Sequence, residues 1–179
     1  MTEKMYTLKD HGVPCSDDLA SAAPDPERLA RGPVAIIECF QRIPCDPCAV
    51  ACPRGAIEPF SDICDLPALD QAKCNGCALC VAKCPGLAVF ILDVSRPGPA
   101  GLVTLPYEYL PLPSPGDEVT GLDRAGDPVG AAKIVKVRRP AAFDRTALVT
   151  IEVPKEQAMR VRGIRLERPP APGEGRGEA

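Results

Sequence analysis

Cysteine is the residue type whose number and spacing in this chain indicate chemistry. Ten cysteines occur in 179 residues, and eight of them fall between residues 39 and 52 or between residues 74 and 84. The second run, Cys74-x2-Cys77-x2-Cys80-x3-Cys84-Pro85, has the spacing with which bacterial proteins bind [4Fe–4S] clusters. Thiolates at positions i, i+3 and i+6 of a compact loop can bind three corners of a cubane. Backbone N–H groups of the same loop can then offset its negative charge.

The fourth cysteine of such a run binds the other cluster when a protein holds two. Applied here, this crossing divides the eight cysteines into two sets of four. We predict that set A binds cluster A and that set B binds cluster B, both clusters being of the [4Fe–4S] type. Set A is Cys39, Cys45, Cys48 and Cys84, and set B is Cys74, Cys77, Cys80 and Cys52.

The first run departs from this spacing, because five residues instead of two separate Cys39 from Cys45. Cys39 follows a predicted strand, so the inserted residues are expected to form a wider loop around the same corner of the cluster. We take Cys39 as the ligand, with Cys64 as the alternative. A site that Cys39 fails to reach could also hold a three-iron cluster. Cys15 and Cys64 are otherwise assigned no role.

Zinc is the main alternative to iron–sulfur binding, since paired Cys-x2-Cys elements also bind tetrahedral zinc. Zinc ribbons do not need three-cysteine runs that each end in x3-Cys-Pro, so the spacing favours clusters. Disulfides are not expected, because the polar start of the chain has no signal-peptide pattern and the cytoplasm keeps thiols reduced. We therefore predict a cytoplasmic protein. His11 is the only histidine, which excludes a Rieske centre.

Charge and motif content argue against several other functions. The net charge of −3 is too small to indicate a nucleic-acid or membrane-surface protein, and no run approaches the roughly 18 apolar residues that span a bilayer. Neither a GxGxxG fingerprint nor a P-loop is present. No catalytic residues are predicted, so the chain is expected to transform no substrate by itself. One basic stretch is either a solvated face or a docking surface for an acidic partner: Lys133, Lys136, Arg138, Arg139 and Arg145.

The two cysteine runs belong to an internal repeat of 32 residues. The cysteines at positions 45, 48 and 52 recur 32 positions later, and so do the following proline and, as Ala88-Val89, the Ala56-Ile57 pair. Each half is expected to consist of strand, cysteine loop, short helix and strand, beginning at residues 34–37 and ending at residues 89–92. Such a repeat indicates two halves related by a pseudo-twofold axis.

Residues 33–95 resemble the two-cluster bacterial ferredoxins. A wider resemblance, over about residues 33–165, is to the small ferredoxin-type subunit of flavin-dependent amino-acid or amine dehydrogenases of the proline, hydroxyproline or opine type. It runs through residues 38–48 (ECFQRIPCDPC), 105–113 (LPYEYLPLP), 143–146 (FDRT) and 153–156 (VPKE).

This resemblance implies an electron-transfer subunit that relays single electrons from a flavin to an acceptor. It also implies a hetero-oligomer with a flavoprotein dehydrogenase subunit, which a [2Fe–2S]-binding subunit often accompanies. Two alternatives remain at this point. One is a stand-alone ferredoxin, and the other is a zinc-binding assembly adaptor without redox activity.

These observations predict an α+β fold, namely a ferredoxin-like dicluster domain with a pseudo-twofold repeat followed by a small all-β barrel-like domain. The dicluster domain would span residues 33–96. Residues 1–32 would be a leader packed on it, with a helix that Asp25 caps, that begins at Pro26 and that stops at Gly32. The β-rich docking domain would span residues 97–168, with strands at 102–105, 129–137 and 147–153. Residues 169–179 would form a mobile tail.

Overall fold

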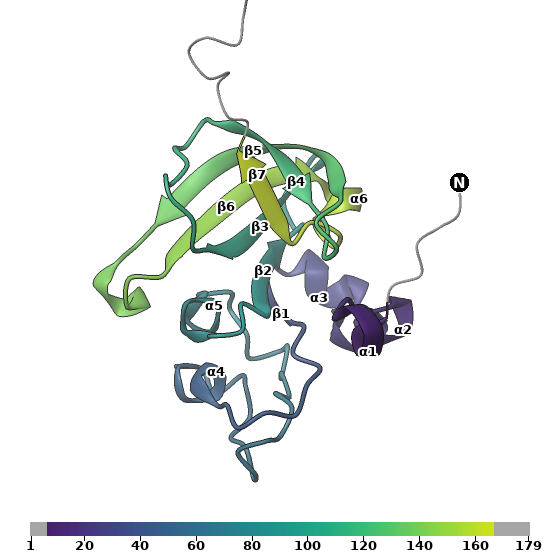
Figure 1. Cartoon of the computed structure of the whole chain (residues 1–179), viewed down its shortest axis with the longest axis vertical. Helices are drawn as coiled ribbons and strands as arrows, with labels where there is room; N and C mark the ends of the chain where they lie inside the picture. The colour runs from purple at the N-terminus through teal and green to yellow at the C-terminus, as the bar shows by residue number, and fades with distance from the viewer. Residues whose placement is uncertain (1–6, 167–179) are drawn as a thin grey trace, which may run out of the picture.

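Seven antiparallel strands form one sheet in the computed structural model, which describes residues 7–166. They follow in the order β1-β2-β3-β6-β5-β4-β7 across the sheet (Figure 1). The strands are β1 Val34–Ile37, β2 Val89–Asp93, β3 Ala100–Tyr107, β4 Glu118–Leu122, β5 Pro128–Arg138, β6 Ala147–Pro154 and β7 Gly163–Leu166. The helices are α1 Leu8–His11, α2 Ser16–Ala22, α3 Pro26–Ala30, α4 Pro47–Val50, α5 Leu79–Lys83, η1 Ala141–Phe143 and α6 Lys155–Ala158. The predicted tail of residues 169–179 lies outside the described residues.

The predicted fold class is wrong. We expected a ferredoxin-like α+β dicluster domain and a separate barrel-like β-domain. Instead β2 pairs with β3 directly across the expected boundary, with Ile91 opposite Thr104 and Asp93 opposite Leu102. The proline- and glycine-rich break at residues 96–99 is a turn within one sheet, and Gly98 has a φ of 94° there. Because the helices are short, the described part of the chain is plainly sheet-rich. Within residues 7–166, no helix has the length and apolar character needed to cross a bilayer.

Strand β2 is buried on both of its faces, which explains its unbroken run of apolar residues. Phe90 and Leu92 belong to a core shared with β3, β5 and β6, whereas Val89 and Ile91 belong to a second core. The second core contains residues of α5 and of the cysteine loops, among them Cys80. The segments that carry the cysteines therefore pack beside β1 and β2, at one end of the sheet (Figure 1).

The start and the Asp25 cap of the helix predicted before β1 are confirmed, and this helix anchors the N-terminal segment. Its predicted end at Gly32 is wrong, because α3 ends at Ala30 and Arg31 is its C-cap. Helix α3 begins at Pro26, and the Asp25 carboxylate accepts a hydrogen bond of 2.6 Å from the backbone N–H of Arg28. Leu29 and Ala22 pack against the main core. The predicted strands at 34–37, 89–92, 102–105, 129–137 and 147–153 are likewise present, as β1, β2, β3, β5 and β6.

A buried group of three charged side chains joins the end of β1 to the far part of the sheet. The Glu38 carboxylate accepts hydrogen bonds from Nε of Arg124 at 2.7 Å and from Nε of Arg162 at 2.8 Å. All three side chains are at most 13% exposed. Burial acts to raise the pKa of Glu38, but hydrogen bonds and charges of the two arginines lower it below its ordinary value. Burial lowers the pKa of Arg162 to about 10, so this guanidinium stays charged at neutral pH.

We predict that Glu38→Gln lowers the free energy of unfolding by about 3 kcal/mol, because it leaves two buried guanidinium groups without their carboxylate. Urea unfolding followed by circular dichroism under anaerobic conditions measures this change. The matched control is Glu118→Gln, at an exposed position of β4, which should change stability by less than about 0.5 kcal/mol. Equal effects of the two substitutions would contradict a structural role for the buried group.

Candidate metal centre

The eight cysteines of sets A and B lie in the segment between β1 and β2, where the sequence repeat is also a repeat of local structure. Cys48 lies in α4 and Cys80 lies in α5, at equivalent positions of the two halves. Gly55 and Leu87, again 32 residues apart, adopt left-handed conformations with φ of 57° and 52°. Each half thus turns its chain in the same way directly after its Cys-Pro pair.

These turns direct backbone N–H groups at sulfur. The N–H of Ala56 donates to Sγ of Cys52 at 3.2 Å, and the N–H of Ala88 donates to Sγ of Cys84 at 3.3 Å. Burial acts to raise the pKa of Cys52, but N–H groups of residues 54–57 together lower it below its ordinary value. The turn after Cys52 therefore stabilises a thiolate, which is the form that binds metal.

The thiols of set A interact with one another. The pKa of Cys48 is raised to about 11, mainly by burial and to a smaller extent by the nearby thiols of Cys84, Cys39 and Cys45. Burial also raises the pKa of Cys39, followed by the effects of Cys84 and Cys45. The wider loop after β1 therefore does not keep Cys39 away from the other three thiols.

The thiols of set B interact in the same way. Burial raises the pKa of Cys80 to about 12, and the thiols of Cys74, Cys77 and Cys52 contribute in that order. In each set the cysteine of the Cys-Pro pair thus lies with the thiols of the other run. The grouping equals the one predicted from the spacing, while iron binding by these thiols stays a prediction.

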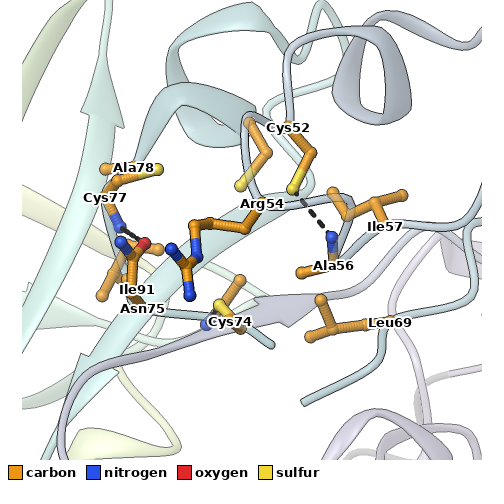
Figure 2. A pocket seen from close by; sticks show the side chains of 13 residues that line it. Cys52, Arg54, Ala56, Ile57, Leu69, Cys74, Asn75, Cys77, Ala78 and Ile91 are labelled. Carbon is orange, nitrogen blue, oxygen red and sulfur yellow. Dashed lines mark hydrogen bonds between the residues drawn. The ribbon is translucent and has the colours of Figure 1, made fainter. Parts of the chain in front are cut away.

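The four thiols of set B line a small cavity, which Figure 2 shows from close by. Apolar side chains of Ile57, Leu69 and Ile91 form part of its wall, next to the four thiols. In the loop between Cys74 and Cys77, Gly76 has a φ of 68°, and a Cβ there would lie 2.6 Å from Cβ of Pro33. This loop can therefore pass close to the N-terminal segment only with glycine at position 76.

Cys64 and Cys15 are not among the thiols that raise the pKa values of Cys39, Cys45 and Cys48, although the backbone N–H of Cys45 donates to the carbonyl of Ile63, next to Cys64, at 3.0 Å. Cys64 is partly buried, and its backbone N–H donates to the Asp62 carboxylate at 2.8 Å within a local turn. Cys15 is exposed and precedes α2, where its backbone N–H donates to Asp18 at 2.9 Å. The structure therefore favours Cys39 over Cys64 as the fourth member of set A.

A single metal ion and a [4Fe–4S] cluster place different demands on the thiols that bind them. Within residues 7–166, no group of three or more Cys, His, Asp or Glu side chains is placed to hold one metal ion. A tetrahedral zinc site needs all its sulfurs at about 2.3 Å from one ion. A [4Fe–4S] cluster makes a different demand, because each thiolate binds its own iron at one corner of the cubane. Two groups of four thiols, each partly buried among apolar side chains, fit that donor set.

Arg28 is a buried cation beside set B that the sequence pattern did not reveal. Its side chain is hydrogen-bonded to four backbone carbonyls, at 2.6 Å to Gln71, 3.0 Å to Gly32, 2.9 Å to Pro33 and 2.8 Å to Cys74. No carboxylate of the described residues forms an ion pair with it. A buried charge without a counterion is costly, so an anionic group beside Cys74 would stabilise this arrangement. The sequence predicted that Arg28 lies in the first turn of α3, but it did not predict the contacts of its side chain with these carbonyls.

Comparisons with protein-family models, with curated proteins and with solved structures found no match to this chain.

We predict that Cys39→Ser reduces the iron content of the anaerobically purified protein from about eight to about four atoms per chain, because cluster A loses a ligand. Cys64→Ser and Cys15→Ser should leave the iron content unchanged. A colorimetric iron assay, scaled to protein concentration, measures all three variants. Loss of iron in Cys64→Ser with retention in Cys39→Ser would reassign the fourth ligand.

Proposed function

We propose that this chain is an electron-transfer subunit that carries two [4Fe–4S] clusters, cluster A on set A and cluster B on set B. The observation that supports the proposal best is the division of the eight thiols into two groups of four across the two runs. Clusters of this type exchange single electrons at potentials set by net charge, hydrogen bonds to sulfur and solvent exposure.

The residues of this chain would prepare each site for such a group. Backbone N–H groups after Cys52 and Cys84 donate to sulfur, and the N–H of Ala35 in β1 donates to Sγ of Cys74 at 3.4 Å. Ile57, Leu69 and Ile91 exclude water from one side of the set B cavity. These contacts stabilise negative charge on sulfur through neutral N–H groups.

The proposed setting is a hetero-oligomeric, flavin-dependent oxidoreductase of the amino-acid or amine dehydrogenase type. A flavoprotein subunit would supply electrons, a [2Fe–2S]-binding subunit could accompany it, and the complex would act in the cytoplasm. The residue resemblance over residues 33–165 supports this setting. Oxidation of substrate would take place on the flavoprotein subunit, so this chain would act as a relay.

A basic surface near α5 supports docking against an acidic partner. Lys136 of β5 is exposed, as are Arg139 and Arg145 around η1. The η1 segment adjoins α5, where Nζ of Lys83 lies 3.4 Å from the Asp144 carboxylate. Because α5 also carries Cys80, a partner bound here would lie close to set B, and charge complementarity would orient it.

Metal analysis after anaerobic purification tests the proposal. We expect a brown protein with about eight irons per chain and an electron paramagnetic resonance signal after reduction with dithionite. Zinc in place of iron would support the assembly adaptor and contradict electron transfer. Iron without a flavoprotein in pull-down experiments from the native host would favour a stand-alone ferredoxin.

We predict that Cys77→Ser abolishes electron transfer to the natural acceptor, because cluster B loses a ligand. The associated flavoprotein should still bind its substrate and reduce its own flavin, which stopped-flow absorbance measures. Undiminished turnover with the natural acceptor would show that cluster B is not on the electron path. Cys15→Ser is the matched control, since Cys15 is exposed and lies outside both sets.

A further inference from the structure

Several charged residues lie within two positions of a cysteine of set A or set B. Lys73 is ion-paired with Asp70, Lys83 with Asp144, and Glu38 with Arg124 and Arg162. The two that form no ion pair within residues 7–166, Arg54 and Asp46, have uncharged equivalents in the other half of the repeat. The repeat relates Arg54, two residues after Cys52, to Gly86, two residues after Cys84. It also relates Asp46, next to Cys45, to Ala78, next to Cys77. Cysteine set B thus has an arginine where set A has none, and set A has a carboxylate where set B has none.

Arg54 reaches into the site that set B surrounds. Its side chain lines the cavity together with the four thiols, and Figure 2 shows it extending from the turn after Cys52 toward Asn75 and Cys74. Within the described residues it forms no ion pair, so its charge is not neutralised by a neighbouring carboxylate. The residue is exposed, which lets the side chain adjust its position over a bound cluster.

Asp46 acts in the opposite sense at set A. It directly follows Cys45 and precedes α4, and its side chain forms no ion pair within residues 7–166. As the N-cap residue of α4, it places its negative charge between Cys45 and Cys48 of set A. The equivalent Ala78 is fully buried and uncharged.

The deeply buried charges balance between the two sets. Arg28 places one uncompensated positive charge beside Cys74 of set B. The group of Glu38, Arg124 and Arg162 also carries one net positive charge, and Glu38 adjoins Cys39 of set A. The difference between the two environments therefore rests on Arg54 and Asp46.

We propose that cluster B has the higher reduction potential of the two, because Arg54 stabilises its reduced form and Asp46 disfavours reduction of cluster A. A cluster gains negative charge on reduction, so a nearby cation favours that state and a nearby anion opposes it. The inference rests on the proposed function, since it requires both clusters. The first electron from a flavin donor then comes to rest on cluster B, and cluster A is reduced only at lower potential.

A redox titration with dithionite and mediators, followed by electron paramagnetic resonance, tests the assignment on the full-length protein. We expect two one-electron steps in the unmodified protein. Arg54→Gln should make reduction at the higher-potential step about tenfold less favourable, equivalent to a shift of about 59 mV for one electron. It should leave the lower-potential step unchanged. Asp46→Asn should raise only the lower-potential step.

Arg160→Gln is the matched control, because Arg160 is an exposed arginine between α6 and β7 and should move neither step. Cys77→Ser and Cys45→Ser assign the steps, since the first should remove the higher-potential signal and the second the lower. A purified protein without iron would contradict the proposed function itself. This inference alone would be overturned if both clusters are present but neither Arg54→Gln nor Asp46→Asn changes a reduction potential. It would also be overturned if Arg54→Gln shifts the lower-potential step and Asp46→Asn the higher.

Discussion

Strand β2 is hydrogen-bonded along both edges, to β1 on one side and to β3 on the other, and the placement of the cysteine segment depends on it. Its alternate residues face two different cores, so one strand orders both the sheet and the cysteine loops. A register shift of one residue would exchange these faces and place Val89 and Ile91 in the wrong core. Glu38, which directly follows β1, forms buried ion pairs with Arg124 and Arg162. These pairs hold the start of the cysteine segment against the part of the sheet that contains β4 and β7.

The environment of the thiols combines two opposing effects. Burial among apolar residues disfavours thiolates, as the raised pKa values of Cys48 and Cys80 show. Backbone N–H groups after each Cys-Pro pair favour them. A bound polynuclear iron group would reconcile these effects, because its positive metal ions compensate the sulfur charge in a site that water reaches poorly.

Local features were predictable from the sequence, whereas distant pairings were not. Cysteine spacing is a property of neighbouring residues, and so are the Asp25 cap and the apolar runs of β1, β2, β3, β5 and β6. Strands β4 and β7 were missed because each is short and contains a glycine and charged side chains. The pairing of β2 with β3 was missed because the turn between them has the composition of a linker. The contact of Glu38 with Arg162 joins residues 124 positions apart, which no local pattern reveals.

The crossing of the Cys-Pro cysteines between the two sets has a consequence for the chain as a polymer. Set A joins residue 39 to residue 84, and set B joins residue 52 to residues 74–80. Metal binding on the proposed ligand sets would therefore close two nested loops, the set B loop inside the set A loop, much as cross-links do. Closing such loops removes conformational freedom from the unfolded chain, and covalent links of similar span contribute roughly 3–4 kcal/mol. The supply of iron and sulfide to this chain would then control its resistance to unfolding and proteolysis as well as its electron transfer.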